Sequence, residues 1–140
     1  MALIPTPDFV KIGQNFAVSS PKDQPTRTYK IDWERGRVQG YTDGQEAMMQ
    51  AVRKILQTNR FAYLIYSWSY GMEWNKVIGK DLPIVRARML PLLKEALLSD
   101  SRIRELTNFQ LTAGSKRTVI VSVTVGTIFG PVSQEVTMNV

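Results

Sequence analysis

The sequence predicts an α+β fold, in which an extended N-terminal arm and a β-hairpin precede two main helices packed on a C-terminal three-stranded antiparallel sheet. Two amphipathic helical patterns in the middle of the chain and three alternating patterns at its end support this class. Strands with one apolar face need a covering layer, and the helices can supply it. The 140 residues are enough for one buried core. We therefore expect an arm over residues 1–27 and a single domain over residues 28–140.

Prolines mark the arm, because residues 1–28 hold four of the seven: Pro5, Pro7, Pro21 and Pro25. Each proline fixes φ and removes an amide donor, which disfavours both a helix and a central strand. Scattered apolar residues make the segment too apolar for a linker and too irregular for an element of its own. We expect an extended arm that lies on this protein or on a neighbour, with a frayed terminus as the alternative.

A hairpin and a helix follow the arm. Residues 28–33 alternate with their apolar side chains on one face, residues 34–36 form a turn that ends in Gly36, and residues 37–41 return. A helix then begins at Thr42 or Asp43, where two capping-box patterns overlap, and ends near residue 57 or 58. Its predicted buried positions are Ala47, Met48, Ala51, Val52, Ile55 and Leu56. Its predicted polar side is formed by Glu46, Gln50, Arg53, Lys54 and Gln57.

The middle of the chain continues with a connector and a second helix. Residues 61–66 are rich in β-formers and predict a short buried strand or an extended connector, and residues 73–78 suit one helical turn. Pro83 opens the second helix, and Pro91 inside its pattern predicts a kink or a division into two shorter helices. The predicted buried face consists of Val85, Met89, Leu92, Leu93, Ala96 and Leu97.

Three strands are predicted at the end of the chain, over residues 108–113, 118–125 and 132–140, each alternating between apolar and polar side chains. Turns at residues 114–115 and 129–130 join them. Gly126 is a candidate β-bulge that would reverse the inward and outward phase of the middle strand. The last strand alternates to the final residue and carries no device that blunts its edge.

Composition excludes several kinds of chemistry. The chain has no Cys and no His, so disulfides, thiolate chemistry and the commonest metal ligand and general base are absent. No phosphate-binding glycine loop, nucleophile elbow or calcium loop occurs. We therefore predict no catalytic residue, no cofactor and no metal. The N-terminus lacks the features of a signal peptide, and no apolar run is long enough to span a bilayer.

The net charge of +6 is the observation that favours a nucleic-acid-binding module as an alternative. The Lys and Arg residues are scattered along the chain, however, and no five-residue basic block occurs. We therefore favour solvated faces with some electrostatic fit to an acidic protein partner over nucleic-acid binding.

Residues 55–73 hold the strongest local signal, an aromatic cluster that ends in Gly71. Glu73 stands beside aromatic residues that would stack a sugar, which raises a peptidoglycan-degrading enzyme as an alternative, but no second carboxylate is evidently paired with it. Tyr, Trp and Arg are also the residues of interface centres. We predict that Leu56, Tyr63 and Ile65 are buried. The side chains of Arg60, Trp68 and Tyr70 are expected to hold the loop or to contact the next subunit.

One stretch of the chain resembles the XkdS family, the small tail proteins of contractile phages and defective prophages of Gram-positive bacteria. The resemblance covers about residues 28–140. It rests on Asp32 in the hairpin, the glycines over residues 40–44, the Glu95–Ile103 stretch and the Gly130 hairpin. It rests most on a long central motif formed by Ala47, Gln50, Ala51, Ile55, Leu56, Thr58, Arg60, Phe61, Tyr63, Ile65, Tyr66, Ser67, Tyr70, Gly71 and Glu73.

That family is similar in turn to the baseplate-wedge, lysozyme-like family of T-even phages, although this chain has Asn59-Arg60-Phe61 where the wider family has Gly-Glu-Arg. The resemblance implies a structural subunit of a contractile tail baseplate, or of a phage-tail-like particle assembled in the host bacterial cytoplasm. Such a subunit would sit around the tail tube and initiate the sheath. Its implied partners are other baseplate wedge proteins, the tail sheath protein, the tail tube and copies of itself, six around the tail axis, with no membrane partner.

The resemblance also implies pairing between strands of neighbouring subunits, which suits an arm and an unblunted last strand. The expected interface and assembly residues are Arg60, Trp68, Tyr70, Gly71, Glu73, Val132, Val136, Met138 and Val140.

Overall fold

The computed structural model describes residues 25–140, so the expected arm lies outside the described residues except for its last three. The observed order of elements is β1 (Thr28–Asp32), β2 (Arg37–Thr42), α2 (Gly44–Gln57), the 3-10 turn η1 (Trp74–Lys76), α3 (Leu82–Leu97), β3 (Ile103–Ala113), β4 (Thr118–Thr127) and β5 (Gly130–Asn139). The α+β class, the hairpin, the two main helices and the three-stranded antiparallel sheet are all confirmed.

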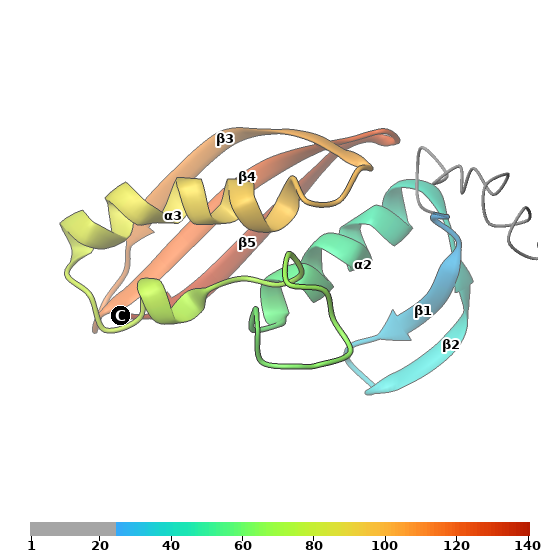
Figure 1. The fold of residues 1–140 in the computed structure, drawn as a ribbon, viewed down its shortest axis with the longest axis horizontal. Coiled ribbons are helices and arrows are strands. Elements are labelled where there is room, and N and C mark those ends of the chain that lie inside the picture. Colours follow the sequence, from blue (N-terminus) through green and yellow to red (C-terminus); the bar gives the residue numbers. More distant parts are fainter. Residues whose placement is uncertain (1–24) are drawn as a thin grey trace, which may run out of the picture.

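The hairpin β1–β2 forms a small sheet of its own beside α2 (Figure 1). Its turn ends in Gly36 at φ 62°, a left-handed conformation that glycine adopts without a steric penalty. Tyr29 and Tyr41 lie opposite each other in the register, and their rings stack with centroids 5.0 Å apart.

Helix α2 begins at the predicted cap, because the Oδ1 atom of Asp43 accepts a hydrogen bond from the amide of Gly44 at 2.7 Å. The expectation that Gln50 belongs to the polar side was wrong. Its side chain is buried, donates to the carbonyl of Tyr29 at 2.8 Å and accepts from the amide of Ile31 at 2.9 Å. The helical pattern alone predicts that the side chain of Gln50 faces solvent. The hairpin instead lies over this side chain and presents backbone groups of β1 that need a hydrogen-bond partner.

The three-stranded sheet has the order β3-β4-β5, with β4 in the middle. Every second residue of β4 is buried through to Thr127, so the predicted reversal of phase at Gly126 was wrong. Strands β4 and β5 pair without interruption. The irregularities lie in β3 instead, one of them beside Asn108 at φ 51°, and β3 begins five residues earlier than predicted.

Helix α3 lies across one face of the sheet, and α2 lies beside β5 (Figure 1). Every residue of the predicted buried face of α3 is buried. The helix continues through Pro91 as one element, so the alternative of two shorter helices was wrong. Pro91 is tolerated because its ring faces solvent and the surrounding turns pack on the sheet.

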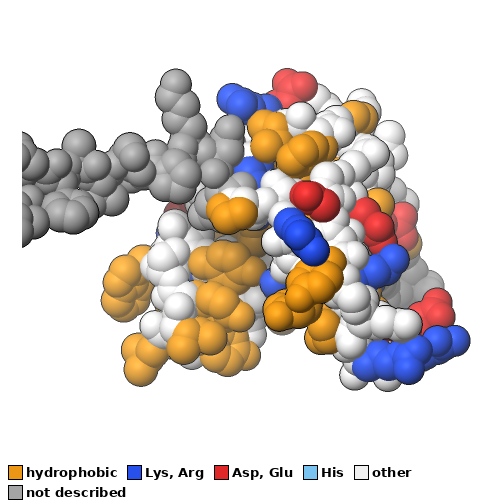
Figure 2. Space-filling view, turned by 90° about the vertical axis from the view of Figure 1, so that its right-hand side faces the viewer, with side chains coloured by type: hydrophobic (Ala, Val, Ile, Leu, Met, Phe, Trp, Pro, Cys, Tyr) orange, Lys and Arg blue, Asp and Glu red, His pale blue; other side chains and the backbone are white. Residues whose placement is uncertain are grey.

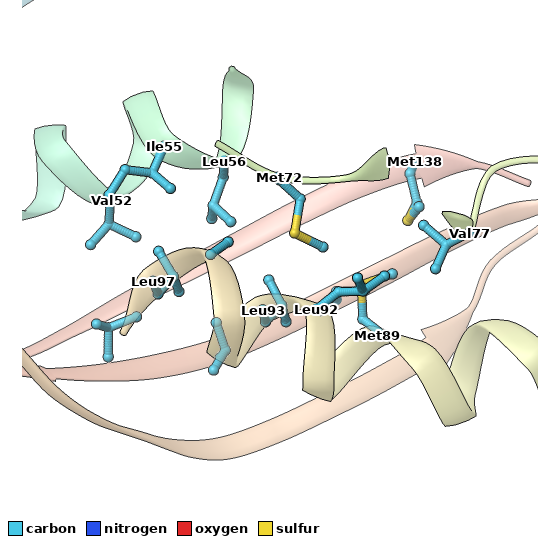
Figure 3. Close-up of a cluster of buried hydrophobic side chains, with 14 of the residues drawn as sticks. Val52, Ile55, Leu56, Met72, Val77, Met89, Leu92, Leu93, Leu97 and Met138 are labelled. Atoms are coloured by element: carbon cyan, nitrogen blue, oxygen red, sulfur yellow. The ribbon is translucent and has the colours of Figure 1, made fainter. Parts of the chain in front are cut away.

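The core lies between the helices and the sheet, where side chains from α2, α3, β4, β5 and the segment between the helices meet (Figure 3). Three of its largest fully buried side chains are methionines, Met48, Met72 and Met89. Their unbranched chains fill irregular gaps between elements of different kinds. Val132 and Met138 of β5 belong to this core.

Candidate assembly site

A closed loop between α2 and η1 forms the first part of the site. Asn59 and Met72 form a parallel β-bridge, in which the amide of Arg60 donates to the carbonyl of Met72 at 3.2 Å and the amide of Met72 donates to the carbonyl of Thr58 at 2.9 Å. The bridge brings the two ends of the chain segment 60–71 together. This segment, which we call the aromatic loop, is a succession of turns, in which the amides of Ala62, Tyr66 and Tyr70 each donate to the carbonyl three residues earlier. The expectation of a short buried strand or an extended connector over residues 61–66 was therefore wrong.

Gly71 makes the closure of the loop possible. An added Cβ atom would lie 2.8 Å from the carbonyl oxygen of Thr58 and 2.9 Å from the amide nitrogen of Arg60, and φ is +104°. Only glycine fits such an approach between two backbones without displacement. Gly71 therefore lies where the two ends of the loop meet, and its lack of a side chain allows the loop to close.

Arg60 ties the loop to the helices. Its Nε atom donates to the carbonyl of Trp68 at 2.7 Å, and its Nη1 atom pairs with the carboxylates of Glu73, at 3.5 Å, and of Glu95 in α3. The hydrogen bond from Arg60 holds the pKa of Glu95 below its usual range. These contacts fix the backbone of the loop close to the β-bridge between Asn59 and Met72.

Glu73 also pairs with Lys76 at 3.0 Å, so two cations occupy its carboxylate. The neighbouring Trp74 donates from its indole Nε1 to the carbonyl of Leu56 at 2.7 Å. These contacts connect η1 to the end of α2. They give Glu73 and Trp74 structural tasks.

The aromatic loop exposes most of its side chains. Leu56 is buried as predicted, but the predictions for Tyr63 and Ile65 were wrong, because they are 55% and 85% exposed. Trp68 is 78% exposed and Leu64 is fully exposed. A β-rich pattern leads to burial only where another element covers it, and no element within residues 25–140 covers Tyr63 or Ile65. On the face turned to the viewer in Figure 2, hydrophobic side chains gather at the lower left, apart from most of the charged ones.

Ring contacts within the loop organise this exposed surface. Phe61 contacts Trp68 at a centroid distance of 5.7 Å, Tyr63 meets Tyr66 edge-on at 6.0 Å, and Tyr66 stacks on Tyr70 at 4.6 Å. Residues 61–72 carry no formal charge. An uncharged, exposed and internally packed aromatic surface is the kind that binds another protein.

Asp100 and Arg102, at the turn before β3, form an ion pair that no sequence motif predicts. The two side chains are buried and bidentate, with Nε–Oδ1 and Nη2–Oδ2 distances of 3.0 and 2.7 Å. Burial opposes the charged form of Asp100, but the hydrogen bonds from Arg102 outweigh it and lower the pKa of the carboxyl. Arg102 also donates to the carbonyl of Pro25 at 3.3 Å, at the point where the arm meets the domain.

Strand β5 forms the second part of the site. In an antiparallel strand, the backbone groups of successive residues point alternately to one neighbour and to the other. The amide of Val140 donates to Arg117, just before β4, at 2.8 Å, whereas the carbonyl of Pro131 accepts from the side chain of Gln45 in α2 at 2.6 Å. Odd-numbered residues of β5 therefore direct their backbone groups away from β4. We call this outer side the β5 edge.

Three residues of the β5 edge, Ser133, Glu135 and Thr137, have outward amides and carbonyls that no backbone hydrogen bond reaches within the described part of the chain. Even-numbered residues point their side chains to the core, where Val132 and Met138 are buried and Val136 and Val140 are partly buried. The side chains of β5 thus hold the domain together, and its backbone remains available for pairing.

A groove of about 760 Å³ separates the β5 edge from α2 and the hairpin. Met49 and Leu56 of α2, Trp33 after β1 and Val136 of β5 supply its apolar walls. Its charged groups largely compensate one another, since Lys30 pairs with Glu46 at 2.7 Å and Arg53 lies over the Trp33 ring. A groove with so little net charge offers a polyanion little electrostatic attraction.

The described residues contain no group of three acidic, Cys or His side chains that would hold a metal, and no helix among them is long and apolar enough to cross a membrane. The site therefore combines a strand edge that is unpaired within residues 25–140 with an exposed aromatic surface, which defines a protein that assembles with other proteins.

Comparison with known proteins agrees with this class. Residues 27–130 match the family model described as contractile injection system sheath initiator. The chain is also 36% identical over 115 residues to the phage-like element PBSX protein XkdS of Bacillus subtilis (strain 168), which covers 79% of each chain. The chain therefore belongs to the sheath initiator family of contractile injection systems.

Proposed function

We propose that this protein acts as a structural baseplate subunit that initiates the tail sheath by offering the β5 edge to a strand of the neighbouring sheath protein. The observation that carries the proposal is the row of unpaired outward backbone groups at Ser133, Glu135 and Thr137 beside an open groove. A strand added there would extend the three-stranded sheet by one member. Main-chain pairing would give the affinity, and the groove would select the incoming side chains.

The expected setting is the baseplate of a phage tail or of a phage-tail-like particle, assembled in the host cytoplasm. The partners are the sheath, the tail tube, other wedge proteins and further copies of this chain, six around the tail axis. Repetition around the axis would present six β5 edges at one level. Such a ring would position the first sheath ring, since each edge specifies both the place and the direction of one incoming strand.

A proline substitution tests the strand edge without disturbing the strand pair inside the domain. Glu135→Pro removes one outward amide, whereas the pairing of β5 with β4 uses the even-numbered residues. Expressed together with the tube, sheath and baseplate proteins of its particle, this variant should give tubes without sheath when the particles are counted by electron microscopy.

Glu135→Ala is the matched control, because it removes the same side chain and keeps the amide. It should support normal sheathed particles. Circular dichroism and thermal unfolding establish that both variants fold. Normal sheath assembly by a folded Glu135→Pro variant would refute pairing at this edge.

The aromatic loop is proposed as a second contact, to a neighbouring baseplate protein. Its exposed side chains contribute little to the domain's own core, so their replacement should leave the fold intact. Trp68→Ala should change the thermal midpoint only slightly and reduce the incorporation of the subunit into baseplates. Lys80→Ala, at an exposed position away from the loop, is the control. Unchanged incorporation of Trp68→Ala would exclude the loop from the interface.

We also propose that the protein has no peptidoglycan-degrading activity. Ion pairs with Arg60 and Lys76 occupy the carboxylate of Glu73, the residue that suggested such chemistry. Zymography on peptidoglycan should give no clearing by the purified protein. Clearing that disappears in Glu73→Gln would restore the enzymatic alternative.

A further inference from the structure

We infer that a polar hollow beside the aromatic loop binds a carboxylate group, which is supplied by the protein that docks on this loop. The hollow has a volume of about 280 Å³ and lies between the end of α2, the aromatic loop and the turn before β3. Its polar lining includes Lys54, Ser67, Ser69, Tyr70, Asp100 and Arg102. The carboxylate site itself is a property of the isolated protein, whereas the source of the carboxylate rests on the loop contact proposed above.

Lys54 supplies positive charge to the hollow. It stands in the last turn of α2, where the helix carbonyls favour a cation. None of the carboxylates within residues 25–140 forms an ion pair with its ammonium group, and Asp100, which lines the same hollow, is bonded through both oxygens to Arg102. The three N–H groups of the ammonium have no acceptor among these residues and can serve a ligand.

Arg102 adds further donors to the hollow. Of the five N–H groups of its guanidinium, one on Nε and one on Nη2 bind Asp100, and one on Nη1 binds the carbonyl of Pro25 at 3.3 Å. The other two have no acceptor among the described residues. Because the side chain is buried, leaving these two groups without a partner costs free energy, and an oxygen ligand would recover it.

Hydroxyl groups of the aromatic loop complete the lining. The Oγ atoms of Ser67 and Ser69 lie 3.2 Å apart and share one hydrogen bond, so one of the two O–H groups can donate elsewhere. Burial raises the pKa of Tyr70, whose hydroxyl therefore keeps its proton at neutral pH. The hollow thus offers more donors than acceptors, which is the composition of an anion site.

The charge of the lining favours a carboxylate over other anions. Lys54 and Arg102 are cations and Asp100 is an anion, so two positive charges and one negative charge leave a net charge of +1. This charge matches a monoanion. A phosphate group carries close to two negative charges at neutral pH, and the nearby carboxylate of Asp100 would repel it more strongly.

The position of the hollow indicates where the carboxylate comes from. Ser67 and Ser69 flank Trp68, which is 78% exposed, so a protein that covers Trp68 also comes next to the hollow. Covering the hollow would remove water from the ammonium of Lys54, which is costly unless an opposite charge takes the place of that water. A carboxylate of the docking protein meets this requirement, and a partner without one would bind less tightly.

Acetate tests the site in the isolated protein. It is added to the full chain at constant ionic strength, with sodium chloride as the reference, and the NMR signal of the Arg102 Nε–H group is followed. Two charge-assisted hydrogen bonds are consistent with a dissociation constant on the order of 10 mM. Lys54→Ala should raise this constant about tenfold, and Lys54→Arg, which keeps the charge, should restore most of the affinity.

Lys94→Ala is the matched control, because Lys94 is an exposed lysine in the last turn of the other main helix, α3, and does not line the hollow. It should bind acetate as the unmodified protein does. Inorganic phosphate, titrated in the same way, should bind more weakly than acetate. The absence of a saturable shift with acetate, equal binding by Lys54→Ala, or tighter binding of phosphate would each overturn the inference.

Particle assembly tests the source of the carboxylate. Lys54→Glu replaces the cation with an anion and should lower the incorporation of the subunit into baseplates about tenfold, whereas Lys94→Glu should not. Normal incorporation of a folded Lys54→Glu variant would exclude the docking protein as the source and leave a free carboxylate as the ligand. The loop contact is judged separately, by Trp68→Ala. A loss of incorporation with Trp68→Ala but not with Lys54→Glu would therefore refute this inference and leave the loop contact standing.

Discussion

At the scale of single residues, Gly71 decides whether the aromatic loop can close. A Cβ atom at this position would meet two backbone atoms of the opposite segment at less than 3 Å, in a backbone conformation that L side chains rarely adopt. Gly71→Ala should therefore lower the free energy of unfolding by roughly 2–4 kcal/mol, as measured by urea denaturation.

The control is Gly79→Ala, because Gly79 has a similar positive φ of +77° and open space around its Cβ position. It should cost only about 1 kcal/mol, the strain of the backbone alone. Equal losses in the two variants would mean that the close approach at Gly71 is relaxed in solution.

At the scale of elements, α3 keeps its continuity in spite of Pro91. The proline leaves the carbonyl of Ala87 without its helical partner, but its side chain lies on the exposed face. Pro91→Ala should restore the hydrogen bond and raise the free energy of unfolding by about 2 kcal/mol, since the gain exceeds the lost restriction of the unfolded chain.

Pro83→Ala is the matched control, because Pro83 stands in the first turn of α3, where no helical hydrogen bond is missing. This variant should be neutral or slightly less stable than the starting protein. A loss of stability in Pro91→Ala would indicate that the packing of α3 on the sheet requires the geometry that the proline imposes.

At the scale of the whole molecule, the Asp100–Arg102 pair connects the start of β3 with the point where the arm enters the domain. Its energy depends on pH. The pKa of Asp100 is lowered in the folded state, so its contribution is fully present above the ordinary value of about 3.9 and is lost as the pH falls through the lower, folded value. Asp100→Asn should cost about 2 kcal/mol at pH 7, and the difference from the starting protein should shrink below about pH 4.

Urea denaturation between pH 3 and pH 7 measures this difference. Glu34→Gln, at an exposed position in the hairpin turn, should change stability by less than about 0.5 kcal/mol at every pH. A difference for Asp100→Asn that stayed constant down to pH 3 would show that the ion pair contributes no pH-dependent stability.

Much of the fold followed from periodicity. The buried face of α3 and the alternation of β4 depend on side chains that repeat at helical or strand spacing, and the start of α2 depends on the local cap at Asp43. Such local patterns act in the same way in any surrounding fold. The failed predictions of burial, at Gln50, Tyr63 and Ile65, concern which element lies over a given side chain. That is decided by contacts between residues distant in the chain.

The candidate site likewise depends partly on local sequence patterns and partly on contacts between residues distant in the chain. The sequence by itself determined the aromatic cluster, its glycine and the unblunted last strand, because composition and alternation are local properties. Only the tertiary structure decided that the side chains of Val132 and Met138 hold the core while the outward backbone of Ser133, Glu135 and Thr137 has no partner among the described residues. A strand has two faces and two edges, and which of them remain open depends on where the other elements pack.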